Sequence, residues 1–198
     1  PGAYRKLGAV WLEGDHLCSA LVQRGGRPAQ AVFTDEAWQQ PALRALAAGA
    51  ARVVLVPAAL FAGISSLPSP ALMGFLVDLP PAGALQPAAP TLVLDRVQDA
   101  GNVGSMLRSA AAFGVRQVVA LKGTAALWSP KVLRAGMGAH FGLSLFDGAE
   151  PALLDELAVP LVATSSHAAA ALPAADLPWP CAWVMGHEGQ GVDAALLA

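Results

Sequence analysis

Apolar and polar positions in the second half of the chain alternate between short strand-like runs and longer segments with helical periodicity. Five short apolar runs predict strands over 91–94, 117–121, 141–146, 161–164 and 182–185. Helical spacing predicts helices over 102–113, from Ser129-Pro130 onward and over 149–157. Because strands alternate with helices, we expect an α/β fold with a mostly parallel sheet covered on both faces.

The first part of the chain predicts a smaller α/β unit. We expect strands over 31–33, 52–56 and 75–77, the second of them buried, and helices over 13–21 and 42–48. Residues 80–90 then hold four prolines and no charged residue, which excludes a regular helix or a central strand. The sequence therefore predicts one domain at 1–79, a linker at 80–90 and a second domain at 91–198.

Composition excludes some classes of protein. Apolar residues make up 55% of the chain and charged residues 13%, yet no uninterrupted apolar run reaches the ~18 residues of a membrane span. With no signal-like segment at its start, the chain is expected in the cytoplasm, without membrane contact. Cys18 and Cys181 show no metal-ligand spacing, so we expect two buried thiols and no metal site.

The net charge of −2 does not indicate a nucleic-acid binder, but the distribution of charge is uneven. From Arg96 to Arg134 there are six bases and one acid, Asp99, whereas seven acids and no Lys or Arg follow Arg134. A basic stretch of this kind is what a local phosphate-binding face requires. Ordinary surface solvation remains the alternative.

The first candidate for chemistry follows strand 91–94. The loop 95–101 leads into a helix in which Asn102 is a good N-cap residue. Gly101, Gly104 and Arg108 fall near one helical face, where the glycines would leave room for the long guanidinium. The alternative is that Arg108 simply points to solvent.

Two further strand ends carry unusual residues. Strand 182–185 is followed by Gly186–Gly191, with three glycines in six residues, a density that brings backbone amides close to a ligand. Within it, Glu188 is expected either to bind a ligand cation or to hold the loop, while His187 is more typical of an exposed loop. Thr164, with Ser165 to His167 after it, is a weaker candidate for a ligand edge.

These segments together resemble the SpoU/TrmH branch of the SPOUT methyltransferases. The resemblance is carried by Asp99 to Ala110 with Phe113-Gly114, by Val184 to Gly191, by Ser129 to Phe141 and by Leu12 to Leu17. It implies a SPOUT-type knotted parallel-sheet methyltransferase domain preceded by a small α/β ribosomal-protein-like substrate-binding domain. It also implies transfer of a methyl group from S-adenosylmethionine to a ribose 2′-hydroxyl of RNA, without a metal.

The resemblance assigns roles residue by residue. Arg108 would bind the phosphate beside the reacting ribose or stabilise the developing alkoxide, since a guanidinium is a poor base. Asn102 would orient the ribose or Arg108, and Glu188 would support the active-site loops. The methyl donor would lie against Thr164, Met185, Gly186 and Gly191. RNA would contact Arg96, Lys131 and Arg134.

Ribosomal RNA is favoured over transfer RNA as the substrate, and homodimers are expected. The family has a third motif, an Ile-Pro strand leading to Ser-Leu-Asn, which does not occur before Ala198; we expect a further C-terminal segment to supply it. One alternative is a non-catalytic RNA-binding protein of the same fold. An unrelated α/β nucleotide-binding protein or oxidoreductase is the other, and the absence of a GxGxxG turn disfavours it.

Overall fold

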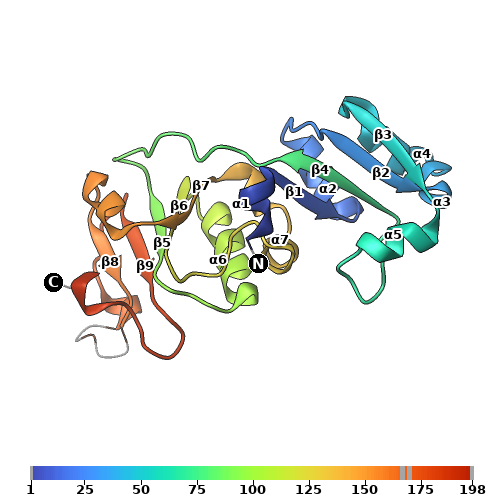
Figure 1. The fold of residues 1–198 in the computed structure, drawn as a ribbon. Helices are drawn as coiled ribbons and strands as arrows, with labels where there is room; N and C mark the ends of the chain where they lie inside the picture. Colours follow the sequence, from blue (N-terminus) through green and yellow to red (C-terminus); the bar gives the residue numbers. More distant parts are fainter. Residues whose placement is uncertain (1, 166–167, 169–170, 197–198) are drawn as a thin grey trace.

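The computed structural model describes residues 2–165, 168 and 171–196, and it contains two β-sheets (Figure 1). The first sheet has the order β1-β4-β2-β3. Its strands are β1 (Ala9–Glu13), β4 (Met73–Asp78), β2 (Gln30–Thr34) and β3 (Arg52–Val56). Strand β4 runs antiparallel to both β1 and β2, while β2 and β3 are parallel. This sheet is therefore mixed.

The second sheet has the order β7-β6-β5-β9-β8, and each neighbouring pair is parallel. Its strands are β7 (Ser144–Ala149), β6 (Gln117–Leu121), β5 (Thr91–Leu94), β9 (Ala182–Met185) and β8 (Leu161–Ala163). The predicted parallel sheet is confirmed. All its carboxyl ends lie on one edge, where ligands bind in open parallel sheets.

Helices around the first sheet are short. They are α1 (Ala3–Leu7), α2 (Asp15–Gln23), α3 (Asp35–Trp38), α4 (Pro41–Ala45) with the 3₁₀ turn η1 (Leu46–Gly49), and α5 (Ala58–Ile64). Two expectations were wrong. The helix predicted from Glu13 begins at Asp15, because Glu13 ends β1 and Gly14 breaks the chain with φ 93°. Strand β3 lies at the sheet edge and is not buried, with Val53 39% and Leu55 45% exposed.

The two faces of the second sheet are covered differently. Helices α6 (Ala100–Ala112) and α7 (Pro130–Gly136) pack on one face, and α7 begins with Ser129 as the N-cap, as predicted. The other face is covered by the 3₁₀ helix η3 (Pro151–Glu156), the linker and the 3₁₀ turn η5 (Ala194–Leu196). The α-helix expected over 149–157 is thus only a 3₁₀ helix.

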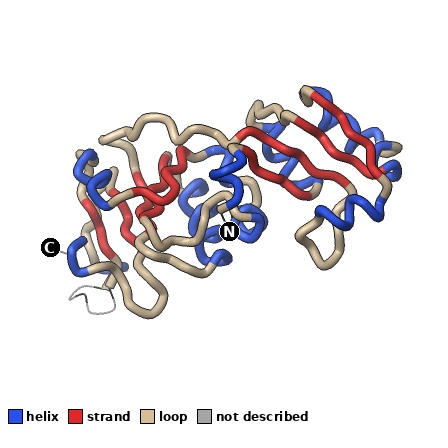
Figure 2. The backbone as a smooth tube through the Cα atoms, in the orientation of Figure 1, coloured by secondary structure: helices blue, strands red, loops and turns tan. Residues whose placement is uncertain are grey.

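The strand expected over 141–146 starts later, at Ser144. The 3₁₀ turn η2 (Ala139–Gly142) comes first, after a left-handed Met137-Gly138 turn. A further 3₁₀ turn, η4 (Leu172–Ala174), precedes β9. Residues 79–90 contain no helix or strand and cross between the sheets as an open loop (Figure 2). The buried Gln117 fixes this loop: its amide donates to the Gln86 carbonyl at 2.9 Å and accepts from the Gln86 N–H at 3.0 Å.

One apolar core joins the two sheets. Leu12 and Phe75 of the first sheet belong to the same buried cluster as Leu94 and Leu107 of the second unit. Helix α1 lies between the two sheets in Figure 1 and is tied to the second, because Tyr4 and Arg5 both bind the Asp147 carboxylate. The first sheet and its helices are therefore held against α6 and α7. This placement brings the first unit and these two helices to the rim of the candidate site. Among the described residues, no helix is long and apolar enough to cross a membrane.

Candidate active site

The N-terminus of α6 is capped by Asp99. Its carboxylate accepts a hydrogen bond from the Asn102 N–H at 2.8 Å, and its backbone is extended, as an N-cap requires. The interpretation of Asn102 as the N-cap was wrong, because Asp99 takes that position three residues earlier. The Asn102 side chain is consequently free for another partner.

That partner is Glu188, in the loop after β9. The Glu188 carboxylate accepts from the backbone N–H groups of Asp99 at 2.9 Å and Gln98 at 3.1 Å, and from the Asn102 amide at 3.2 Å. These hydrogen bonds, those from the Asp99 and Gln98 backbone first, lower the pKa of Glu188 to about 2. A carboxylate at the N-terminus of a helix also complements the helix dipole. Glu188 therefore holds the loop after β9 against the start of α6.

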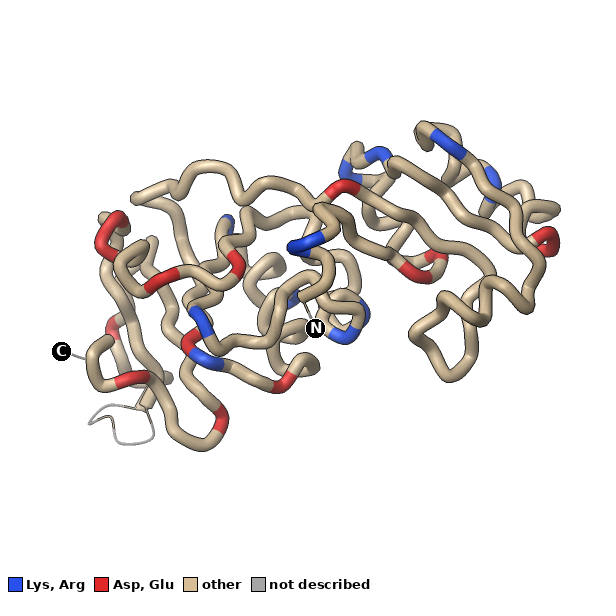
Figure 3. Tube along the Cα trace, viewed as in Figure 1, with Lys and Arg blue, Asp and Glu red and all other residues tan. Residues whose placement is uncertain are grey.

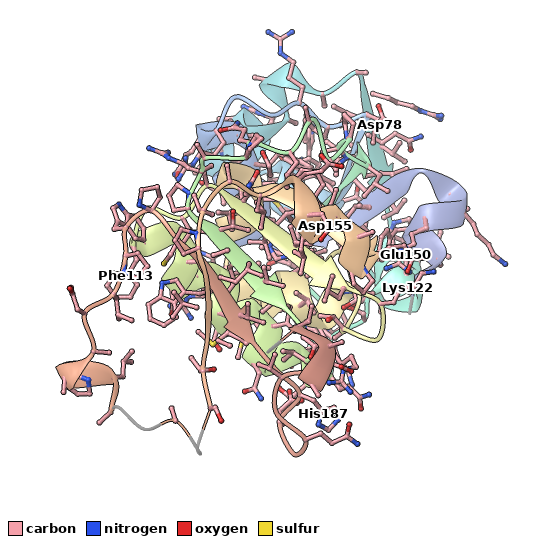
Figure 4. All side chains as sticks on the ribbon, turned by 90° about the vertical axis from the view of Figure 1, so that its left-hand side faces the viewer. Asp78, Phe113, Lys122, Glu150, Asp155 and His187 are labelled. Atoms are coloured by element: carbon pink, nitrogen blue, oxygen red, sulfur yellow. The ribbon has the colours of Figure 1, made fainter. Side chains whose placement is uncertain are left out.

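The Gly-rich loop is closed on itself. His187 and Gly191 exchange backbone hydrogen bonds at 3.0 and 2.9 Å, and the His187 Nδ1 accepts from the Gly189 N–H at 2.9 Å. A Cβ at Gly186 would lie 2.2 Å from Gly191 C and Val192 N. Gly186 thus allows a close backbone crossing within the loop, and the ligand approach that we expected stays a prediction. Figure 4 shows His187 on this loop, at one extreme end of the molecule.

An ion pair between Asp95 and Arg96 also contacts the loop after β9. The buried Asp95, directly after β5, accepts from Arg96 Nε at 2.9 Å, Arg96 Nη2 at 3.0 Å and the Asp193 N–H at 2.7 Å. Burial alone would raise the pKa of Asp95, but these hydrogen bonds outweigh it and lower the pKa. Arg96 also donates to Gln190 at 3.3 Å. Its donors are thus directed at protein groups, so the structure gives Arg96 a loop-fixing role beside the predicted RNA contact.

The residues predicted to hold the methyl donor lie together at the carboxyl ends of β8 and β9. The Thr164 hydroxyl donates to the Val184 carbonyl at 3.4 Å and lies 3.6 Å from the Met185 sulfur. Gly186 and Gly191 follow on the same loop. Ser166 and His167 of the same strand end lie outside the described residues.

Arg108 lies apart from this group. It is exposed on α6, six residues after Asn102, which places it about 9 Å further along the helix and turned by about 240°. It lines a different cavity, together with Arg24 and the turn after α7. A single chain therefore brings Asn102 and Glu188 together but does not bring Arg108 to them.

The prediction that Gly104 leaves room for the Arg108 guanidinium was wrong. It is buried where α6 crosses α7, and a Cβ there would lie 2.3 Å from the Ala135 Cβ. Gly101 has only the Asp99 carboxylate close to its Cβ position, at 2.9 Å. The glycine at 104 permits close helix packing, and this explains it without a ligand.

Two of the predicted RNA-binding residues line a cavity of about 680 Å³ beside the start of α6. Lys131 and Arg134 of α7 form one wall, and Gln98 and Asp99 form another. Ser66, from the loop after α5, closes the cavity and accepts from Arg134 at 3.1 Å. Along the backbone, Lys and Arg positions occur in both halves of the molecule, and so do Asp and Glu positions (Figure 3).

Several residues at this site were not predicted. Gln98 and Asp99 bind the Glu188 carboxylate through their backbone N–H groups, and no side-chain pattern marks such a role. Ser66 is held by Glu13, whose carboxylate accepts from the Ser66 N–H at 3.0 Å and the Ser65 hydroxyl. An acid at the end of a strand was the available signal at Glu13, as it was at Asp95. Within the described part of the chain, no group of three or more His, Cys, Asp or Glu could hold a metal ion.

Comparison with known proteins decides the family. The SpoU rRNA Methylase family matches residues 89–198, more than half of the chain. The chain belongs to the SpoU rRNA methylase family. The match covers the second sheet, α6, α7 and the Gly-rich loop, so the paired Asn102 and Glu188 lie within it.

The similarity of this SpoU family member to some of its relatives extends beyond the matched region. The 23S rRNA (guanosine(2553)-2′-O)-methyltransferase RlmP of Bacillus subtilis is 29% identical over 97% of this chain and 77% of its own. The human mitochondrial rRNA methyltransferase 3 is 46% identical, over 35% of this chain and 17% of its own length. A Porphyromonas gingivalis protein assigned to the TrmH family of RNA methyltransferases has a TM-score of 0.78 at 30% identity, covering 98% of this chain and 78% of that one.

The fold alone is shared with the SpoU methyltransferase AviRb of Streptomyces viridochromogenes, solved in complex with AdoMet. Its TM-score is 0.86 at 19% identity, covering 97% of this chain and 78% of that one. The first sheet is included in this similarity, because the match extends well before residue 89. This SpoU family member therefore shares both of its sheets with that structure.

Proposed function

We propose that this protein transfers a methyl group from S-adenosylmethionine to a ribose 2′-hydroxyl of ribosomal RNA. The observation that carries the proposal is the meeting of Asn102 and Glu188, 86 positions apart, at the carboxyl ends of neighbouring parallel strands. Two segments of the SpoU family thereby form one site. The similarity to a 23S rRNA 2′-O-methyltransferase covers 97% of this chain, and it supports ribosomal RNA over transfer RNA.

The methyl donor would lie against the carboxyl ends of β8 and β9. Thr164, Met185, Gly186 and Gly191 offer a hydroxyl, a thioether and backbone groups there, a neutral set that fits an adenosine better than a metal. When bound, S-adenosylmethionine supplies a methyl group carried by a sulfonium, whose sulfur leaves readily as a neutral thioether. The protein has to orient the ribose oxygen and stabilise its developing charge.

Three residues would do this work. Glu188 remains ionised and keeps the Asn102 amide in a fixed orientation, so that its amide oxygen can face the ribose. Arg108 would bind the phosphate next to the reacting ribose or stabilise the alkoxide. We place the RNA along α7, where Lys131 and Arg134 line the larger cavity.

The separation of Arg108 from Asn102 supports a homodimer as the working form, in which each site is completed across the interface. Phe113, directly after α6, is strongly exposed, and Trp179 and Leu172 line the same apolar surface. Figure 4 shows Phe113 projecting from one side of the sheet. Exposed apolar patches of this kind are typical of protein interfaces.

The organisation that goes with this function is also a proposal. Residues 1–79 would form a ribosomal-protein-like RNA-binding domain, 80–90 a linker, and 91–198 a SPOUT-type knotted methyltransferase domain. The mixed first sheet and the open linker support this division. A ribosomal RNA substrate fits a cytoplasmic location.

The test is methyl transfer from tritiated S-adenosylmethionine to unmodified ribosomal RNA, with unmodified transfer RNA in parallel. Mass spectrometry of the product should find a 2′-O-methylated ribose in ribosomal RNA. Arg108→Ala should abolish transfer while the thermal unfolding midpoint stays unchanged. RNA binding without any transfer by the wild type would favour the alternative, a non-catalytic RNA-binding protein.

A further inference from the structure

Two arginines from distant parts of the chain line one cavity. Arg24 caps the C-terminus of α2, and Arg108 lies on α6; between them is a cavity of about 320 Å³. Gln23 and the turn from Gly136 to Ala139 form most of the remaining wall. The site is therefore built from the first sheet's helix on one side and from α6 and α7 on the other.

The walls of this cavity fit tightly. A Cβ at Gly138 would lie 2.5 Å from the Ala20 Cβ, so the turn after α7 packs directly on α2. A Cβ at Gly142 would lie 3.2 Å from the Arg24 Cζ, so the Arg24 guanidinium rests against the backbone there. Arg24 is thus oriented by contact with the second half of the molecule, although it belongs to the first.

Neither guanidinium is neutralised by the protein. In the part of the chain that the structure describes, the side chains of Arg24 and Arg108 make no ion pair and no hydrogen bond. Among the same described residues, no Asp or Glu lines the cavity, and its polar side chains are the two arginines and Gln23. Two positive charges in one acid-free cavity attract an anion.

The chemistry of the pair selects the kind of anion. A guanidinium presents a planar fork of N–H donors that matches phosphate oxygens, and two forks can hold both free oxygens of a phosphodiester. The cavity is about ten times the ~30 Å³ that one water occupies in the liquid, which leaves room for a phosphate group and its sugar.

We propose that Arg24 and Arg108 bind one phosphodiester of the RNA substrate together, which makes Arg24 a substrate-binding residue. This inference rests on the proposed function only in taking RNA as the substrate. The cavity with Lys131 lies at the start of α7 and this one at its end, about 9 Å apart along the helix. At the ~3.4 Å per nucleotide of one strand of a DNA duplex, a stacked strand covers that distance in about three nucleotides.

The test compares Arg24→Ala with Arg27→Ala. Arg27, three residues on, is also exposed, and its side chain covers Gly49 and does not line the cavity. Binding of a short fluorescein-labelled oligouridylate is measured by fluorescence anisotropy over a range of salt concentrations. Losing one phosphate contact should weaken binding about tenfold and reduce the slope of log K against log salt by about 0.7. Arg27→Ala should change the slope little.

The double variant Arg24→Ala/Arg108→Ala decides whether one phosphate is shared. If it is, the double variant should lose little more slope than either single variant, and Arg24→Lys should keep the slope at reduced affinity. Equal behaviour of Arg24→Ala and Arg27→Ala, or slope losses that simply add, would overturn the proposal. Methyl transfer by the wild type is measured separately, so failure of the proposed function is distinguishable from failure of this binding site.

Discussion

Replacing Gly104 by Ala should destabilise the protein, although helix propensity alone predicts the opposite. Alanine in a helix interior is favoured over glycine by about 1 kcal/mol. At 104, however, the new Cβ would lie 2.3 Å from the Ala135 Cβ and 2.7 Å from the backbone of Ala135 and Gly136. Unstrained carbon atoms need about 3.5–4.0 Å, so α6 and α7 must separate by over an ångström.

The magnitude follows from these opposing effects. Overpacking of this kind costs about 1–3 kcal/mol, and the contact with backbone, which cannot rotate away, places Gly104→Ala at the upper end. Subtracting the ~1 kcal/mol gain in helix propensity leaves a net loss of about 2 kcal/mol. For a chain of 198 residues this lowers the unfolding midpoint by about 4–8 °C.

The matched control is Gly63→Ala. Gly63 also lies in a helix, α5, but nothing comes within 4 Å of its Cβ position. This variant should therefore gain up to ~1 kcal/mol and unfold about 2–4 °C higher. Thermal unfolding followed by circular dichroism, with urea midpoints as a second measure, compares the two. A Gly104→Ala protein as stable as the wild type would refute the helix-contact explanation.

Three further predictions concern the two hydrogen-bonded carboxylates. Glu188→Gln places an amide against the Gln98 and Asp99 N–H groups and should reduce methyl transfer at least tenfold, with RNA affinity nearly unchanged. The control is Glu150→Gln, which removes the charge of an exposed carboxylate paired with Lys122 (Figure 4). Equal activities of the two variants would contradict the role of Glu188. Because the pKa of Glu188 is lowered from 4.5 to about 2, its stabilising effect is complete above pH ~4.5 and is lost as the pH falls toward 2; a Glu188→Gln difference in unfolding midpoint that persisted unchanged at pH ~2 would be inconsistent with this. Glu13→Ala leaves several donors of the loop after α5 without their acceptor and should lower the unfolding free energy by about 1–3 kcal/mol in urea titrations, whereas wild-type stability would mean that solvent replaces the carboxylate.

The second sheet was predictable because its strands are short, nearly continuous apolar runs, such as Thr91–Leu94 and Gln117–Leu121, which are typical of a sheet buried on both faces. Strand β1 was missed because it runs directly into the helical pattern after Glu13, and periodicity does not locate the boundary. The exposed edge position of β3 depends on which strands pair, and local sequence carries no information about that.

At the site, the family resemblance brought Asn102, Arg108 and Glu188 forward, but their distances needed the fold. Asn102 and Glu188 meet only because β9 lies beside β5. The resemblance implied a joint role for Asn102 and Arg108, but their spacing of six residues places them on different sides of the helix. Gly104 shows the limit of a residue-type argument, because a glycine that admits a ligand and a glycine that admits a second helix look alike in sequence.

The order of strands in the second sheet has a consequence for synthesis on the ribosome. Strand β9 follows β5, β6, β7 and β8 in the sequence, yet it occupies an inner position between β5 and β8. Until residue 185 has emerged, the apolar strand Thr91–Leu94 presents unpaired N–H and C=O groups along one side. Open strand edges of this kind pair readily with other chains. The nascent protein is therefore most prone to aggregate in the interval between the appearance of β5 and that of β9, a window of about ninety residues of translation.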